Sequence, residues 1–351
     1  MERIWRVGIV GLGHWYSAFG LARALPEYPK AELVAVAYHD EAKAQEFGRT
    51  FGIEAYTEYD DLLAREDIDI VHICPPGVEM PDCTIKAAQA GKHIILGKPL
   101  AMTVGRATEM VRIVEEAGIT CVPWPEMYRV TDASLKARLD KGLIGDIVVM
   151  HATGRWSIGE DWLRSGQVGW FADPQQTPGG AMIDEGMSSL GRIRWLAGSN
   201  TVQVEAKVAN FVHKDIGVED GAMATFTFDN GIMATLENSW TINSPQKTGP
   251  SPKQNGVIRM EIVGTRGEVI QERLRVPGMA VLAAGAPNWV FERPMGEYFV
   301  SSPPTALDYA IRCIENNEEP VANIQEALKS FKLAMAAYEA AREGTTVRPS
   351  L

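Results

Sequence analysis

The first 120 residues alternate short apolar runs with amphipathic stretches of helical length. Apolar runs of this kind are typical of strands that are buried on both faces of a parallel sheet. They cover residues 6–10, 33–37, 69–74, 93–96 and 119–122. The stretches between them predict helices over residues 17–25, 40–51, 80–90 and 103–117. Strands that alternate with such helices predict βαβ units, and therefore an α/β domain with a doubly wound parallel sheet.

The second half of the chain has a different pattern, in which strand-like segments predominate. These segments cover residues 147–153, 202–212, 221–228, 232–240 and 257–263. Asp229-Asn230-Gly231 joins two of them and is a strong hairpin signal, because Asn and Gly tolerate positive φ. Two helices are expected last, over residues 304–316 and 323–342. This half therefore predicts a second α/β domain with a large open, mostly antiparallel sheet.

The change of pattern places the domain boundary after residue 122. A chain of 351 residues is also too long for one core, so length favours two domains as well. We expect a first domain over residues 1–122 and a second over 123–351. The C-terminal helices belong to the second domain by sequence order, and packing back on the first domain is the alternative.

Charge and cysteine usage narrow the class of protein. The net charge of -11 argues against nucleic acid and membrane surfaces as partners, because both are held mainly by Lys and Arg. No run of 18 apolar residues is present, and no apolar signal region precedes the first strand. The four cysteines form no C-x-x-C pair, which argues against a metal site and a disulfide framework. We expect a cytoplasmic protein without a bound metal.

The first strand runs into a glycine-rich turn. Residues 7–13 read VGIVGLG, and a predicted helix follows. In dinucleotide-binding folds, the first glycine makes the tight turn and the second lets the backbone approach a pyrophosphate at the helix N-terminus. The usual third small residue is replaced by Tyr16, so an ordinary strand–turn–helix is the alternative. The position of Gly11 and Gly13 at the start of an alternating α/β domain favours a Rossmann cofactor loop.

The end of the second strand bears on the choice of cofactor. An acid at this place usually binds the adenosine ribose, and a 2′-phosphate would need Arg or Lys. Here Tyr38 stands where the acid is usual, Asp40 follows, and no Arg or Lys occurs before Lys43. NAD is therefore favoured over NADP. Asp40 has a second possible role, because Asp is also a preferred helix N-cap.

Several segments together carry a family resemblance. The segment GKHIILGKPLA at residues 91–101 resembles a signature of the glucose–fructose oxidoreductase, inositol dehydrogenase and rhizopine catabolism (Gfo/Idh/MocA) family. Other segments resemble that family in the same order along the chain. They are DIVHICPP at 69–76, WFADP at 170–174, GGAMIDEG at 179–186, ED at 219–220, FDNG at 228–231 and AAYEAAREG at 336–344. Each segment alone is a modest signal, whereas the ordered set is strong.

The resemblance implies a fold, an activity and an assembly. Family members join an N-terminal Rossmann domain to an α/β domain whose open sheet commonly mediates dimers or tetramers. They are typically sugar, polyol or cyclitol oxidoreductases that use a nicotinamide cofactor. By this resemblance, residues 1–122 bind NAD, and residues 123–351 bind substrate and form a homodimer or homotetramer.

Site residues follow from the resemblance position by position. Lys98 matches the family lysine that assists proton transfer at the reacting hydroxyl, and Asp184 matches the aspartate that binds the substrate. The alternatives are a solvated charge at a strand end for Lys98 and a helix N-cap for Asp184. The predicted substrate-binding residues are Lys98, Tyr128, Trp156, Asp184 and Ser188. The predicted cofactor-binding residues are Gly11, Gly13, His14, Trp15, Tyr38, Asp40, Pro75, Pro76 and Lys98.

The chain departs from the family pattern near these residues. Ser188 stands where the family has its catalytic histidine, and Gly191 stands at the following aspartate position. A serine hydroxyl can relay a proton but cannot titrate near neutral pH as imidazole does. Gly97 replaces the usual Glu before the lysine, and Glu79 stands where a His often occurs. Either Lys98 alone carries the base role, or another residue substitutes, or the usual reaction is lost.

Three functions remain open at this point. The first is an NAD-dependent dehydrogenase that oxidises a sugar hydroxyl, with the anomeric hydroxyl of an aldose such as D-apiose or xylose as a candidate. The second is an enzyme that recycles one bound NAD in epimerisation, elimination or paired oxidoreduction. The third is a non-catalytic sugar sensor, against which the retention of Lys98 and Asp184 argues.

The strands of the second domain also bear on assembly. Ala222, Ala224, Phe226 and Phe228 form one apolar face of a strand, and the other face carries Met223 with two threonines. A sheet that is partly apolar on both faces needs a cover on each. We expect a second subunit to provide one of them. Cover by the C-terminal helices and loops of the same chain is the alternative.

Overall fold

The computed structural model describes residues 3–156, 169–241, 256–273, 278–292 and 302–350. The chain divides into two compact units. The first unit comprises residues 1–127, 175–178 and 301–328, and the second comprises 128–174, 179–300 and 329–351. None of the helices in the described ranges is long and apolar enough to cross a membrane.

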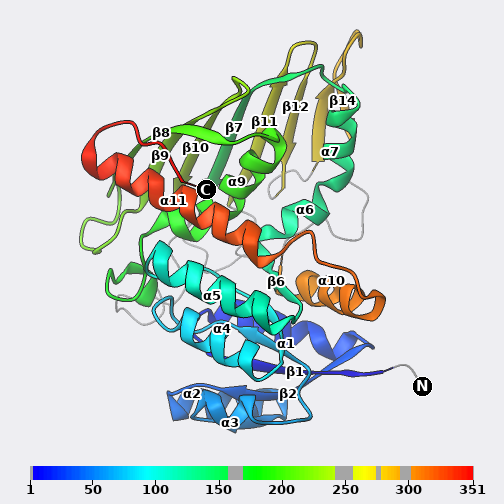
Figure 1. The fold of residues 1–351 in the computed structure, drawn as a ribbon, viewed down its shortest axis with the longest axis vertical. Coiled ribbons are helices and arrows are strands. Elements are labelled where there is room, and N and C mark those ends of the chain that lie inside the picture. The colour runs from blue at the N-terminus through cyan, green and yellow to red at the C-terminus, as the bar shows by residue number, and fades with distance from the viewer. Residues whose placement is uncertain (1–2, 157–168, 242–255, 274–277, 293–301, 351) are drawn as a thin grey trace, which may run out of the picture. The chain divides into compact units, whose positions relative to one another are not determined.

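The first unit contains a six-stranded sheet in the order β3-β2-β1-β4-β5-β6, in which every pairing is parallel (Figure 1). Its strands are β1 (Trp5–Val10), β2 (Ala31–Ala37), β3 (Glu54–Tyr56), β4 (Ile70–Ile73), β5 (His93–Leu96) and β6 (Cys121–Pro123). The strand order reverses beside β1, the place at which ligands bind in doubly wound sheets. The predicted Rossmann sheet is confirmed.

Helices connect these strands and cover the sheet. They are α1 (Trp15–Ala24), α2 (Glu41–Phe51), α3 (Tyr59–Leu63), α4 (Met80–Gln89) and α5 (Val104–Ala117), with the 3₁₀ turns η1 (Leu25–Glu27) and η2 (Trp124–Met127). A buried polar link ties α1 to the sheet. Ser17 donates to Nε2 of His72 at 2.7 Å, and Nδ1–H of His72 donates to the Ile95 carbonyl at 3.2 Å. Burial lowers the pKa of His72 to about 4, so this side chain is neutral at pH 7.

The end of the chain contributes to both units. α10 (Pro303–Asn316) belongs to the first unit, where it packs against α1, β5 and β6. α11 (Ile324–Glu343) begins in the first unit and continues in the second. The first unit therefore extends beyond residue 122 and includes a C-terminal helix, which differs from the boundary drawn from sequence order. The apolar face of α10, not its place in the sequence, decides where it packs.

The second unit contains an eight-stranded sheet in the order β14-β13-β12-β11-β7-β10-β9-β8. Its strands are β7 (Ile147–Arg155), β8 (Thr201–Ala209), β9 (Gly221–Phe228), β10 (Met233–Ser239), β11 (Val257–Gly264), β12 (Glu268–Glu272), β13 (Gly278–Leu282) and β14 (Val290–Glu292). β7 and β10 run parallel, whereas all other neighbours are antiparallel. The predicted open, mostly antiparallel sheet is confirmed.

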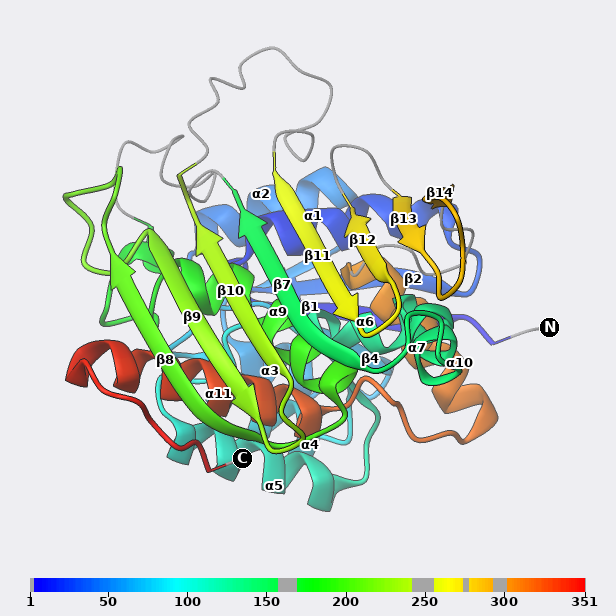
Figure 2. The same cartoon turned by 90° about the horizontal axis from the view of Figure 1, so that it is seen from above.

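One long helix lies on this sheet. α9 (Ala181–Ala197) packs against β7, β9 and β10, and Figure 2 shows the sheet face-on with α9 behind it. Ala222, Ala224, Phe226 and Phe228 are buried on the α9 side, as expected for one apolar face. The shorter helices of the unit are α6 (Tyr128–Thr131), α7 (Ala133–Asp140) and the 3₁₀ turn η3 (Trp170–Ala172).

Candidate functional site

The loop after β1 has room for backbone only. Gly11 has φ +86°, and a Cβ there would lie 2.5 Å from Cα of Pro75. A Cβ on Gly13 would lie 2.4 Å from N of Pro76, so both glycines let the loop after β1 pack directly on the loop after β4. The first turn of α1 carries no acidic side chain, which leaves its positive end suited to an anion. This glycine cradle fits the pyrophosphate of a dinucleotide.

His14 links the cofactor loop to the segment that carries Lys98. The His14 ring is buried, and its Nε2–H donates to the Lys98 carbonyl. Tyr16 donates its hydroxyl to Nδ1 of His14 at 3.1 Å. Tyr16 is 38% exposed, so a large residue is tolerated at the third position of the glycine motif. Trp15, another predicted cofactor residue, is the first residue of α1.

The end of β2 presents Tyr38 and Asp40. Tyr38 is buried, and its ring lies 4.3 Å from that of His39. Asp40 is the N-cap of α2 and accepts a hydrogen bond from the backbone N–H of Lys43 at 3.1 Å. That bond is the main cause that lowers the pKa of Asp40. The helix-cap alternative is therefore confirmed, whereas ribose binding by Asp40 stays a prediction.

Lys98 follows β5 and is only 5% exposed. Its Nζ lies 5.7 Å from the centre of the Trp124 ring, within the range of a cation–π contact. The alternative of a solvated charge at a strand end is therefore wrong. A Cβ on Gly97 would already lie 3.2 Å from the Ile73 carbonyl oxygen, so the small residue before the lysine suits close packing against the end of β4.

Asp184 lies in the first turn of α9, and the capping of this helix comes from elsewhere. Gly180 is the N-cap residue, and Glu219 accepts hydrogen bonds from the N–H groups of Gly180 and Met182, both at 2.9 Å. The indole Nε1–H of Trp240 donates to Oδ2 of Asp184 at 3.0 Å. The N-cap alternative for Asp184 is therefore wrong. The carboxylate is held by an aromatic donor instead.

Close backbone packing builds the start of α9. A Cβ on Gly180 would lie 1.9 Å from the Glu219 carbonyl oxygen, and a Cβ on Gly179 would lie 2.1 Å from the Tyr338 hydroxyl. Tyr338 also donates to Oε1 of Glu219 at 2.7 Å. The glycine pair and the Glu219–Tyr338 link together set the position from which Asp184 projects.

Aromatic side chains surround this turn. Trp240 is buried with Ala181 in a small apolar cluster, against which Trp156 and Phe171 pack. Nε1 of Trp156 is buried and forms no hydrogen bond within the described parts of the chain. Aromatic faces beside a carboxylate and an indole donor suit a polyhydroxylated ligand, which offers both apolar C–H surface and hydroxyls.

Ser188 and Gly191 share one face of α9 with Asp184, since they follow it by four and seven residues. A Cβ on Gly191 would lie 2.6 Å from the Tyr128 hydroxyl and 2.5 Å from Oγ of Ser330. Tyr128 therefore occupies the space that a larger residue at position 191 would need. Tyr128 is only 1% exposed, and its role in substrate binding stays a prediction.

Sequence reasoning missed several residues of this arrangement. Trp240 and Glu219 had no assigned role, because their links to α9 span 56 and 37–39 residues of sequence. The glycine pair was noticed only as part of a motif. His151 on β7 is exposed on the sheet face opposite α9, where its Nδ1 lies 2.8 Å from Oγ1 of Thr235.

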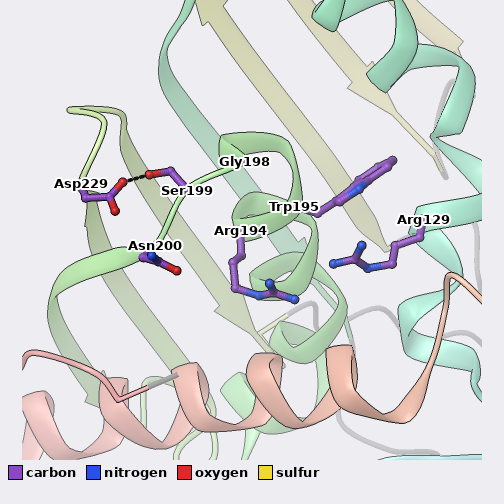
Figure 3. A pocket seen from close by; sticks show the side chains of 7 residues that line it. All are labelled: Arg129, Arg194, Trp195, Gly198, Ser199, Asn200 and Asp229. Atoms are coloured by element: carbon purple, nitrogen blue, oxygen red, sulfur yellow. Dashed lines mark hydrogen bonds between the residues drawn. The ribbon is translucent and has the colours of Figure 1, made fainter.

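A pocket lies near the C-terminal end of α9. It has a volume of about 400 Å³ and is lined by Arg129, Arg194, Trp195, Gly198, Ser199, Asn200 and Asp229. Figure 3 shows the side chains of Arg129 and Arg194 extending into the same space. Asp184 precedes Arg194 by ten residues, about 15 Å along the helix axis. This pocket contains none of the predicted site residues. Across the described part of the chain, His, Cys, Asp and Glu form no cluster suited to a metal.

Two family models match the chain. The model described as an oxidoreductase family with an NAD-binding Rossmann fold matches residues 5–123. The model of the GFO/IDH/MocA C-terminal domain matches residues 133–270. The first unit is therefore an NAD-binding Rossmann domain, in agreement with the glycine cradle after β1.

Curated relatives and solved structures match almost the whole chain. A scyllo-inositol 2-dehydrogenase (NAD(+)) of Bacillus subtilis strain 168 is 26% identical, over 99% of this chain and 97% of its own. A D-apiose dehydrogenase of Paraburkholderia graminis is 27% identical, over 90% and 83%. The structure of a levoglucosan dehydrogenase in complex with NADH has a TM-score of 0.81 at 21% identity, over 99% and 100%. With both domain models matched in order, the chain belongs to the GFO/IDH/MocA family of NAD-binding oxidoreductases.

Proposed function

We propose that this protein is an NAD-dependent dehydrogenase that oxidises a hydroxyl group of a sugar. The observation that carries the proposal is Asp184, a carboxylate held by the Trp240 indole among aromatic side chains, in a chain with an NAD-binding domain. The named activities of the inositol and apiose dehydrogenases support the same substrate class.

Bound NAD⁺ supplies the hydride acceptor for such a reaction. We assign to Lys98 the removal of the hydroxyl proton, since burial of its side chain disfavours the charged form of the amine and so favours a form that can accept a proton. In this oxidation of C–OH to C=O, Nζ of Lys98 would take the hydroxyl proton, and the cofactor would take the hydride from the same carbon. We assign to Asp184 the orientation of the substrate through a charge-assisted hydrogen bond.

Among sugar hydroxyls, we favour the anomeric hydroxyl of an aldose, which gives a lactone. The anomeric hydroxyl is more acidic than an ordinary alcohol, so it makes a smaller demand on the base. Ser188, in place of a histidine, offers no group that titrates near neutral pH. An enzyme with Lys98 as its main base is better matched to the more acidic hydroxyl.

A substrate panel tests the proposal. The purified protein is incubated with NAD⁺ and a set of aldoses, polyols and sugar acids, and NADH formation is followed by absorbance. We expect steady NADH formation with at least one aldose. A single-turnover absorbance change without NADH accumulation would instead indicate the enzyme that recycles its cofactor. If compounds bind but none of them produces an absorbance change, the result would favour a sugar sensor.

We also propose that the open sheet face of the second unit joins two subunits. Met223 and Met233 lie on the face opposite α9 and are 60% and 50% exposed. Light scattering at micromolar concentration should therefore give at least twice the chain mass. Met223→Glu with Met233→Glu should lower that mass, whereas Val321→Glu, at another exposed apolar position, should not. A monomeric wild type would contradict the proposal.

The cytoplasm is the compartment that we propose for this enzyme. Its four cysteines are all buried free thiols, as is usual in a reducing compartment.

A further inference from the structure

Three side chains meet where β2 and β4 end. Glu79 lies in the loop after β4, His39 in the loop after β2, and Tyr59 at the start of α3. The Tyr59 hydroxyl donates to Oε2 of Glu79 at 2.8 Å, and Nδ1–H of His39 donates to the Tyr59 oxygen at 3.3 Å. Nδ1 of His39 also lies 3.8 Å from Oε2 of Glu79. The Glu79 carboxylate is thus tied to the end of β2 although it follows β4.

This cluster holds a carboxylate in a defined place. Burial, and then the neighbouring Glu79, raise the pKa of Tyr59, so the hydroxyl keeps its proton and remains the donor. Both close contacts of Glu79 use Oε2, and within the described residues Oε1 forms no hydrogen bond. The Glu79 side chain is 31% exposed, so a ligand can reach it. Oε1 is therefore an acceptor at the surface of the cofactor domain.

Asp40, the acid that follows β2 in sequence and was predicted to bind the ribose, already bonds to Lys43. Asp40 accepts from the backbone N–H of Lys43 at 3.1 Å, and its Oδ2 lies 3.2 Å from Nζ of the same lysine. Lys43, the first Lys or Arg after β2, is therefore paired with a carboxylate, which makes it a poor partner for a phosphate. The end of β2 therefore offers no strong phosphate ligand, and its first acid, Asp40, is already hydrogen-bonded within its own helix.

We propose that Glu79 makes this domain select NAD over NADP. In doubly wound nucleotide-binding sheets, the adenosine ribose lies at the end of the strand that corresponds to β2, where a carboxylate accepts from its hydroxyls. Glu79 brings a carboxylate to that place from the neighbouring loop, and Tyr59 fixes its direction. A 2′-phosphate there would face the negative charge of Glu79 with Asp40 close by in sequence, and the nearest lysine, Lys43, is already paired with Asp40.

Binding measurements without any sugar test this inference. Dissociation constants of NADH and NADPH are measured by fluorescence titration for the wild type, Glu79→Gln and Glu46→Gln. Glu46 is an exposed acid on α2 of the same unit, so its substitution removes the same charge from a different place. We expect Glu79→Gln to lower the ratio of the NADPH constant to the NADH constant at least tenfold, mainly through tighter NADPH binding. Glu46→Gln should leave the ratio within about twofold of wild type.

Two further variants separate Glu79 from its neighbours. Tyr59→Phe keeps the charge but removes the donor that orients it, so NADH binding should weaken several-fold. Asp40→Asn should change the ratio less than Glu79→Gln does. The inference is overturned if Glu79→Gln leaves the ratio within twofold of wild type, if Glu46→Gln changes it equally, or if Asp40→Asn changes it more. If Glu79→Gln does not fold, unchanged NADH binding by Tyr59→Phe overturns it. Failure of the sugar proposal would leave these binding constants unaffected.

Discussion

Lys98→Met is expected to lower turnover by about 10²–10⁴-fold, the usual scale for the loss of a general base. Methionine keeps much of the length and packing of the lysine stem but cannot accept a proton. The affinity for the cofactor, measured with NADH, should stay within a few-fold of wild type, because the glycine cradle after β1 is untouched. Initial rates with the sugar identified by the panel, together with fluorescence titration of NADH, measure the two quantities separately.

Lys92→Met is the matched control for this experiment. Lys92 is also a buried lysine of the first unit, but its Nζ donates to the carbonyls of Arg65 and Ile68, at 2.6 and 3.0 Å. Its loss should lower thermal stability and leave the turnover of the folded enzyme close to wild type. Wild-type turnover in Lys98→Met would show that Lys98 is not the base, and equal loss in both variants would show a structural effect.

The fold of the first unit could be predicted closely because each strand is a continuous apolar run. β5 occupies residues 93–96 as predicted, and β1, β2, β4 and β6 lie within two residues of the predicted bounds. β3 and α3 were missed. They have three and five residues, which is too short for periodicity to distinguish them from a loop.

The second unit shows where local patterns fail. β13 and β14 lie inside segment 276–303, whose Pro, Gly and Ser content gives no clear strand pattern. β13 pairs with β12 and with β14, and the backbone hydrogen bonds between these strands stabilise them although their own sequences have no clear strand pattern. α9 was not predicted as a helix either, because its two internal glycines and two serines lower its helix propensity. Tertiary packing against β7, β9 and β10 overrides that propensity.

Some residues of the candidate site could be predicted from local sequence, whereas others could not. Asp184 and Lys98 could be selected from short motifs, since a motif is local in sequence. What holds Asp184 could not be selected, because the Trp240 indole reaches it from the end of β10. The Glu79–Tyr59–His39 cluster likewise depends on the adjacency of β2, β1 and β4, which no local pattern contains.

Asp184→Ala is expected to lower turnover far more than Ser188→Ala does. In the proposed reaction, Asp184 is the charged acceptor that positions the reacting hydroxyl, and its removal also leaves the Trp240 indole without that partner. Ser188 contributes at most one neutral hydrogen bond, so Ser188→Ala should cost about tenfold or less. Turnover and KM for both variants are measured with the same sugar.

Two more variants test whether the residues around Ser188 are now packed for a serine and no longer for a histidine. Ser188→His should fold without raising activity, because the neighbouring position on the same helix face, Gly191, is already closed by the Tyr128 hydroxyl. Trp240→Phe removes the donor to Asp184 but keeps an aromatic ring, so its loss of turnover should fall between those of the two alanine variants. If Ser188→Ala is the more damaging of the two, the serine carries the proton and the roles assigned to Asp184 and Ser188 must be exchanged. If Ser188→His raises turnover, the histidine position is still connected to the reacting hydroxyl, and Lys98 does not act alone.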